Sequence, residues 1–213
     1  MDKKKRKKKK LIMLIILLLI IIGGGTGAYF YFQKEEPQPE PKKIEVLDKI
    51  IGFEYSLEDR DTAVYKETFL ELKKTLESDT FEDKTYAELL AKLFVIDLYT
   101  IDNKISKYDV GSQDFIYPEE KEKFTSKVMD TMYKLVEDNT TGTRRGELPI
   151  VKEVEVTKTE ETTYKKGTTN LKGYQIEVFI SYEKDLGYDK KITLTLVKEE
   201  NKIYVVQTKT LDD

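Results

Sequence analysis

The segment from Leu11 to Phe32 contains 22 residues, most of them apolar, and no charged side chain. As a helix rising about 1.5 Å per residue, it would reach roughly 33 Å, which is enough to cross a hydrocarbon core of about 30 Å. The aliphatic run Leu11–Ile22 alone would reach only about 18 Å, so the span must include the glycines and the aromatic end, Tyr29–Phe32, which suits a membrane interface. This stretch therefore predicts a transmembrane helix whose partner is the lipid bilayer.

Charge on the two sides of this span predicts its orientation. Residues 1–10 carry eight Lys or Arg and one Asp, whereas residues 33–43 are of mixed charge. Because basic residues flank the cytoplasmic side of membrane spans, we expect residues 1–10 in the cytoplasm and residues 44–213 outside it. The run Lys3–Lys10 would then lie against the anionic lipids of the inner leaflet. The sequence thus predicts a single-pass protein of the cell membrane with an extracytoplasmic C-terminal domain.

Two alternatives for this segment stay open. The apolar run Leu11–Ile22 after a basic stretch also fits a cleavable signal peptide, with "TGA" ending at Ala28 as the cleavage site. The uncharged stretch continues past Ala28 into four aromatic residues, which favours a retained anchor. Gly23 and Gly27 match the small-residue motif that pairs transmembrane helices, although three adjacent glycines equally fit a loose helix exit. Homo-oligomerisation is therefore a second open question.

Composition excludes several classes of function. Outside the first ten residues the chain has 29 basic and 39 acidic residues, a net charge of −10, so no nucleic-acid partner is expected. The sequence contains neither Cys nor His, which excludes thiolate chemistry and catalytic triads that use histidine. Acid–base catalysis by paired carboxylates needs a desolvated group, which a sequence cannot show. We therefore predict a protein that is not an enzyme and that uses no cofactor and no metal.

A proline-rich linker separates the predicted span from a globular region. The segment "EEPQPEP", Glu35–Pro41, alternates proline with polar residues and should be extended and semi-rigid, at about 3.1 Å per residue. Residues 33–43 would hold the following domain roughly 30 Å from the membrane surface. The predicted organisation is thus a basic segment (1–10), a transmembrane helix (11–32), a linker (33–43) and a domain (44–213).

The first half of that domain predicts three helices. After the short apolar stretch "IEVLDKIIGFEYSL", a helix capped by Asp59 or Asp61 has apolar residues at helical spacing: Ala63, Tyr65, Phe69, Leu72 and Leu76. A second helix is predicted from about Thr80 to Tyr99, with the apolar set Tyr86, Leu89, Leu90, Leu93, Phe94 and Ile96. A third begins at Pro118 and places on one stripe Phe124, Val128, Met132, Leu135 and Val136. These stripes are typical of a buried core.

After Asn139 the apolar period changes from helical to alternating. Four strands are predicted, with inward residues Ile150, Val154 and Val156 in the first, Tyr174, Ile176, Val178, Ile180 and Tyr182 in the second, and Ile192, Leu194 and Leu196 in the third. The segment "NKIYVVQTKTL" forms the fourth, joined to the third by a hairpin at "KEENK". Alternation with one polar face is typical of an antiparallel sheet.

Helices followed by an antiparallel sheet predict an α+β domain, with about three helices packed on a curved four-stranded antiparallel sheet. This order resembles the cone of the NTF2-like fold. Together with the anchor and linker, it resembles the bitopic VirB8/TcpC-type components of type IV secretion and conjugation machines. The resemblance covers most of the chain but rests on architecture, so it assigns no functional residue. It implies an assembly subunit outside the membrane.

The connection between the second and third predicted helices is the candidate site. It is dense in carboxylates and aromatic rings, and the residues that we select as partner-binding candidates are Tyr99, Asp102, Tyr108, Asp109, Asp114 and Tyr117. Asp in turns and Tyr at core edges would give the same pattern in a purely structural connection. Its spacing does not match a calcium loop. Arg144 and Arg145 lie in a predicted loop, where such a pair either meets an acidic partner or anionic lipid or is simply solvated.

These observations predict a membrane-anchored extracytoplasmic interaction or assembly module that is not an enzyme, with an unknown protein partner and a place in a cell-envelope or secretion assembly. The alternative is a surface-tethered domain that binds a small molecule or a peptide in the cavity of the cone. A third hypothesis, a hydrolase that uses carboxylates, depends on burial that the sequence does not reveal.

Overall fold

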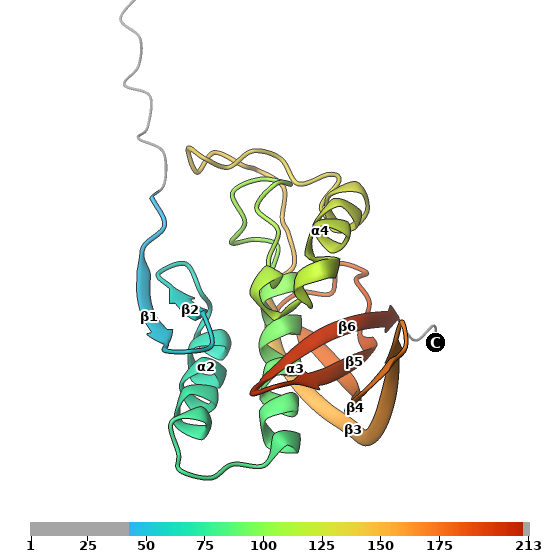
Figure 1. Cartoon of the computed structure of the whole chain (residues 1–213). Helices are drawn as coiled ribbons and strands as arrows, with labels where there is room; N and C mark the ends of the chain where they lie inside the picture. The colour runs from blue at the N-terminus through green and yellow to red at the C-terminus, as the bar shows by residue number, and fades with distance from the viewer. Residues whose placement is uncertain (1–42, 211–213) are drawn as a thin grey trace, which may run out of the picture. The chain divides into compact units, whose positions relative to one another are not determined.

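The computed structural model describes residues 43–210, which are coloured in Figure 1. The predicted basic segment, the transmembrane helix and residues 33–42 of the linker lie outside the described residues. Between residues 43 and 210, no helix is both long enough and apolar enough to span a bilayer.

The described region is an α+β domain built around helix α3, as Figure 1 shows. On one side α3 packs against helix α2, and on the other side it packs against a four-stranded antiparallel sheet of order β3-β4-β5-β6. The bounds of the helices are Ala63–Leu76 (α2), Asp83–Tyr99 (α3) and Lys121–Asp130 (α4). The bounds of the strands in this sheet are Val151–Lys166 (β3), Thr169–Tyr182 (β4), Lys191–Glu199 (β5) and Lys202–Thr210 (β6). The predicted α+β class, with three helices and a four-stranded antiparallel sheet, is confirmed. The predicted packing of about three helices on the sheet was wrong, because α3 covers the sheet and α2 packs chiefly against α3.

Helix α3 supplies the centre of the hydrophobic core. The predicted apolar set is buried throughout, namely Tyr86, Leu89, Leu90, Leu93, Phe94 and Ile96. Burying an aliphatic or aromatic side chain of this size contributes about 1.5–3 kcal/mol. One face of α3 packs against α2 and the opposite face packs against the sheet, which explains why this helix is apolar almost all round.

Helix α2 begins differently from the prediction. Its N-cap is Thr62, whose Oγ1 accepts a hydrogen bond from Tyr65 N–H at 3.4 Å. Asp59 and Asp61 do not cap the helix, because their carboxylates accept instead from the N–H groups of Glu45 and Glu58. Of the predicted stripe, Tyr65, Phe69, Leu72 and Leu76 are buried, whereas Ala63 is exposed.

Helix α4 is shorter than the predicted third helix. A 3-10 turn, Pro118–Glu120, precedes it, and the backbone leaves the helical region at Thr131. The chain then turns so that Tyr133 enters the core and donates from its hydroxyl to Leu98 O at 2.8 Å. The prediction for Leu135 was therefore wrong: this side chain is 86% exposed because the helix ends before reaching it.

A second small sheet was not predicted. Strands β1 (Val46–Ile50) and β2 (Tyr55–Glu58) form an antiparallel hairpin within the short apolar stretch that precedes α2. The turn uses Gly52 and Glu54, both at positive φ. Tyr55 from β2 is fully buried, and its hydroxyl lies 2.7 Å from the hydroxyl of Tyr86 on α3.

The alternation in the main sheet is confirmed in β4 and β5 and shifted in β3. The inward sets of β4 and β5 are buried or half-buried, and the predicted β5–β6 hairpin closes at Glu199 and Lys202. In β3, register shifts at Val151–Glu153 and Val156–Lys158 change the phase. Val151 is consequently buried in place of the predicted Ile150, because a bulge moves the next side chain onto the inner face.

Candidate functional site

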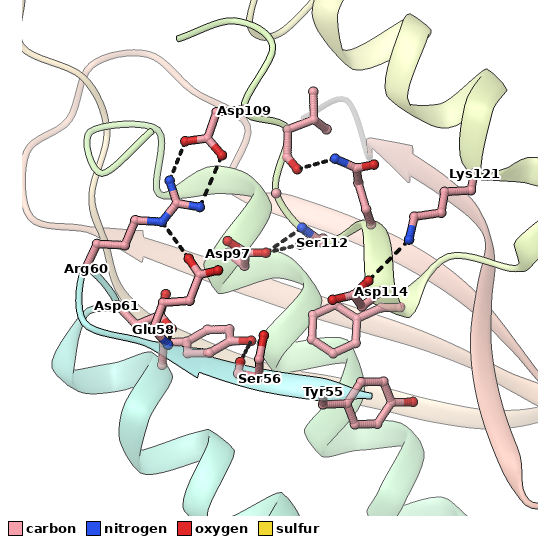
Figure 2. Close-up of a pocket in the computed structure, with 15 residues that line it drawn as sticks. Tyr55, Ser56, Glu58, Arg60, Asp61, Asp97, Asp109, Ser112, Asp114 and Lys121 are labelled. Carbon is pink, nitrogen blue, oxygen red and sulfur yellow. Dashed lines mark hydrogen bonds and ion pairs between the residues drawn. The ribbon is translucent and has the colours of Figure 1, made fainter. Parts of the chain in front are cut away.

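The connection between α3 and the 3-10 turn η2 (Pro118–Glu120) covers residues 100–117. It forms one wall of an open cavity of about 300 Å³. Figure 2 shows this cavity, which is lined by strand β2, the loop from β2 to α2, the starts of α2 and α4, the end of α3 and the connection itself. Its aromatic wall is made by Tyr55, Tyr65 and Phe115. Seven charged side chains also line it: Glu58, Arg60, Asp61, Asp97, Asp109, Asp114 and Lys121.

Arg60 fixes the outer part of the connection. Its guanidinium forms a two-point ion pair with Asp109, in which Nη2 donates to Oδ1 at 3.1 Å, and its Nε donates to Glu58 at 2.7 Å. Asp109 also accepts from Ile105 N–H at 2.8 Å. Burial alone would raise the pKa of Asp109, but the hydrogen bonds from Arg60 and Ile105 hold it below its usual value. The carboxylate is thus charged and fixed in position at neutral pH.

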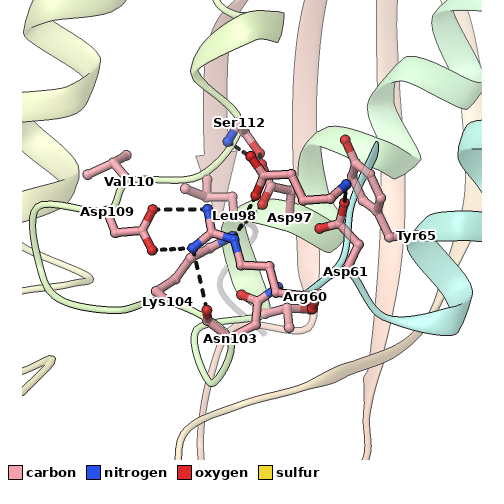
Figure 3. Close-up of polar contacts among 12 residues, drawn as sticks. Arg60, Asp61, Tyr65, Asp97, Leu98, Asn103, Lys104, Asp109, Val110 and Ser112 are labelled. Carbon is pink, nitrogen blue, oxygen red and sulfur yellow. Dashed lines mark hydrogen bonds and ion pairs between the residues drawn. The ribbon is translucent and has the colours of Figure 1, made fainter. Parts of the chain in front are cut away.

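Lys104 fixes the inner part, as Figure 3 shows. Its side chain is only 1% exposed, and its ammonium pairs with Asp97 at the end of α3. Asp97 also accepts from the backbone N–H and the hydroxyl of Ser112, and the same hydroxyl donates to Phe94 O at 2.7 Å. Gly111 must be glycine, because a Cβ there would lie 2.8 Å from Asp97 O. The connection is therefore attached to the end of α3 at two positions, Lys104 and Ser112.

Arg144 supplies a third buried cation. Its guanidinium, 4% exposed, donates to the carbonyl oxygens of Asp102 at 2.5 Å and Lys104 at 2.9 Å. The reading of this arginine as solvated or as partner-binding was wrong, because the loop carbonyls take up its hydrogen bonds. Arg145 is exposed, as expected for a solvated side chain.

The structure divides the six predicted partner-binding residues. Asp109 and Asp114 line the cavity. Tyr99 and Tyr117 are buried and do not line it, and the Tyr117 hydroxyl donates to Glu199 at 2.7 Å. Asp102 is exposed outside the cavity, as is Tyr108, whose side chain is 69% exposed.

Sequence reasoning missed Glu58 and Arg60 as cavity residues and considered Asp61 only as a helix cap. Arg60 and Asp109 are 49 residues apart in the chain, so no local pattern connects them. Asp97 was not selected either. It belongs to the same acidic stretch as the predicted residues, and its place near the end of an apolar helix was a signal that could have identified it.

The cavity carries an excess of negative charge. Its lining has five carboxylates and two cations, and counting Lys104 behind the wall still leaves two carboxylates in excess. Asp61 is bonded only to a backbone N–H, that of Glu58 at 2.6 Å, and burial, with a contribution from the charge of Asp97, raises its pKa to about 6. Asp114 pairs with Lys121 at 3.2 Å at an exposed position, where solvent weakens such pairs. These two carboxylates are the ones least neutralised by the domain itself.

Chemically, this arrangement favours a ligand that carries positive charge or several hydrogen-bond donors. Within residues 43–210, no three carboxylates are grouped so that they would hold a metal ion. The comparisons with known proteins add no further assignment: no family model, no curated protein and no solved structure matches this chain significantly. The candidate site therefore rests on its own geometry.

Proposed function

We propose that this chain is a single-pass membrane-anchored, extracytoplasmic interaction module, not an enzyme, that serves as a subunit of a cell-envelope or secretion assembly. The observation that carries the proposal is the open acidic cavity, whose walls are held by two paired cations, the buried Lys104 and the half-buried Arg60. A surface with fixed charges loses little conformational entropy on binding, which favours recognition of a partner. The uncharged span Leu11–Phe32 and the proline-rich linker support the placement of the domain outside the membrane.

The NTF2-like cone and the likeness to VirB8/TcpC-type components belong to this proposal. The order of elements, helices before an antiparallel sheet, supports them. The concave space of such a cone is occupied here by apolar side chains of α3 and the sheet, among them Leu90, Ile176 and Leu194, all of them fully buried. A ligand would therefore use the cavity beside the connection rather than the interior between helix and sheet.

Cavity size favours a second candidate function, a surface-tethered domain that binds a small polar molecule or a peptide end. A volume of about 300 Å³ lies at the lower end of the range for small-molecule sites. The two candidates share the same residues and differ in what fills the cavity. Co-purification of a small ligand with the full-length protein would favour the second.

The test is crosslinking in intact cells, followed by purification of the full-length chain. We expect a defined protein neighbour with the wild type and its loss with Asp61→Asn combined with Asp114→Asn, because the cavity then loses its two least neutralised charges. The matched control is Asp102→Asn, which changes an exposed carboxylate outside the cavity. Equal capture by all three proteins would contradict the proposed site.

Orientation has its own test. Protease added to intact protoplasts should remove residues 44–213 and spare residues 1–10, because the basic side of the span faces the cytoplasm. Protection of the C-terminal domain would contradict the proposed topology. A mature N-terminus at Tyr29 would instead support a cleaved signal peptide.

A further inference from the structure

The tip of the β3–β4 hairpin, defined here as Thr162–Gly173, is a basic surface on an acidic protein. It contains three lysines and no acidic residue, whereas residues 11–213 together carry a net charge of −10. Lys165 and Lys172 are exposed, and the structure of residues 43–210 gives neither of them an ion pair. Lys166 is partly committed, since it donates to Glu119 at 2.9 Å and to the Tyr117 hydroxyl at 2.7 Å.

This tip extends beyond the rest of the sheet. The β4–β5 pairing ends at Gly173 and Val197, whereas the β3–β4 pairing continues to Lys166 and Thr169. At Gly173, the last residue of β4 that pairs with β5 on this side, the two backbones are so close that a Cβ would lie 1.9 Å from Leu196 O. From Glu155 to Lys172 no side chain is fully buried. The tip is therefore a projecting two-stranded arm whose lysines are available to another molecule.

The chain itself carries a surface of complementary charge and shape. The acidic cavity has Asp61, which forms no ion pair among residues 43–210, and Asp114, whose exposed pair with Lys121 is weak. The exposed lining of this open cavity is mainly polar, and its carboxylates can hold the ammonium of a lysine side chain. We propose that the tip of one copy docks in the acidic cavity of a second copy, with Lys165 or Lys172 between Asp61 and Asp114.

A second copy fits this tip better than an anionic lipid surface or an anionic polymer. Residues 11–213 together carry a net charge of −10, which disfavours a polyanion, whereas the cavity offers a localised acidic site of limited size. The predicted anchor would hold all copies in one membrane with the same orientation, which raises their effective concentration. Each copy has one tip and one cavity, so association gives a reciprocal dimer, a head-to-tail ring or an open filament. The inference rests on the proposed function and specifies the partner.

The chain lacks cysteine, which allows a direct test with pairs of single-cysteine variants. Full-length Thr168→Cys, in the tip, and full-length Ser56→Cys, in the cavity lining, would carry different tags, be expressed together in one membrane and be mildly oxidised; both variants keep the lysines and carboxylates of the proposed contact. A disulfide between the two tags can form only between copies. We expect it in this pair and expect several-fold less in the matched control pair, Thr168→Cys with Thr141→Cys, because Thr141 is exposed outside the cavity. Equal yields in the two pairs would overturn the inference.

Charge reversal separates this inference from the proposed function. Lys165→Glu combined with Lys172→Glu should weaken self-association roughly tenfold or more, since like charges would then face each other at the contact. Lys158→Glu combined with Lys190→Glu, two changes of exposed lysines outside the tip, is the matched control. If the tip variant loses retention on vesicles containing phosphatidylglycerol but keeps its self-association, the tip binds anionic lipid and the inference is wrong. Capture of a different protein that is unaffected by the tip changes would also overturn it, while leaving the proposed function standing.

Discussion

The connection between α3 and η2 and the tip of the β3–β4 hairpin are both long polar segments, yet the domain holds them in opposite ways. Three buried or half-buried cations, Lys104, Arg60 and Arg144, tie the connection to its neighbours through ion pairs and carbonyl contacts. The tip has no fully buried side chain; Lys166 bonds to Tyr117 and Glu119 at the surface, and Tyr164 lines a cavity together with residues of α4 and β6. Polarity alone therefore does not decide whether a segment is fixed; the burial of its charged partners does.

The same comparison separates two roles. A segment tied to the core by buried pairs keeps its carboxylates in place, as a recognition surface requires. A projecting hairpin with little burial belongs to the least stable part of a domain and can adapt to a surface that it meets. The cavity thus provides the fixed acidic side of the proposed contact, and the tip provides the exposed basic side.

The largest expected effect comes from removing the most buried cation. Lys104→Met leaves the Asp97 carboxylate without its ionic partner, so we expect the free energy of unfolding to fall by about 3 kcal/mol. Denaturant titration of residues 44–213 measures this change. The double variant Lys104→Met, Asp97→Asn should recover part of the loss, because no uncompensated charge remains. If Lys104→Met were as stable as the wild type, the connection would not be held as described.

The next effect is at the outer attachment and depends on pH. Arg60→Gln removes the two-point pair with Asp109, which should cost about 2 kcal/mol at pH 7. The pKa of Asp109 is lower in the folded state, so its contribution is present above the unfolded value of about 3.9 and is lost as pH falls through the folded value. The difference in stability between wild type and variant should therefore shrink below about pH 4. A difference independent of pH would argue against the ion pair.

A smaller effect of opposite sign is expected at Asp61. Burial, together with the charge of Asp97, raises the pKa of Asp61 to about 6. The folded state therefore takes up a proton between about pH 6 and the unfolded pKa value near 4. The contribution of this group to stability rises as pH falls through that window. Asp61→Asn should consequently stabilise the domain at pH 7, on the order of 1 kcal/mol after allowance for partial exposure, and make no difference near pH 4. Thermal melts of the two proteins at several pH values would show this convergence.

The smallest effect is expected at the tip. Lys165→Ala combined with Lys172→Ala should change the free energy of unfolding by less than about 0.5 kcal/mol, since both side chains are exposed and unpaired among residues 43–210. A loss of several kcal/mol would show that the tip is part of the cooperative core.

Tyr108→Ala, at an exposed position of the connection, should have an equally small effect on the free energy of unfolding, whereas Asp109→Ala should have a larger one.

These contrasts also show what the sequence could reveal. The period of apolar residues predicted β4 and β5, because each strand buries a regular face, and it predicted α3, because this helix buries apolar rows against α2 and the sheet. The density of Asp and Tyr predicted the connection as a candidate site, and two of the six selected residues line the cavity. Local periodicity was enough wherever burial follows the repeat of the backbone.

The remaining features depend on contacts between distant residues. The partners of Asp109 and of the Lys104 carbonyl are Arg60 and Arg144, 49 and 40 residues away in the chain, and nothing in the surrounding pattern indicates either pair. The end of α4 depends on where Tyr133 packs, and the phase of β3 depends on bulges set by its pairing with β4. Sequence spacing therefore identified the elements, but it could not assign the charges that position the connection.

Amide hydrogen exchange on the full-length chain, at low and at high protein concentration, tests the account most directly. At low concentration, the N–H groups of Ile105 and Ser112, bonded to Asp109 and Asp97, should exchange at least about a hundredfold more slowly than those of the tip. At high concentration, protection should increase at the tip and around the cavity and stay unchanged elsewhere. Equal protection of the two segments at low concentration, or no dependence on concentration, would contradict the account.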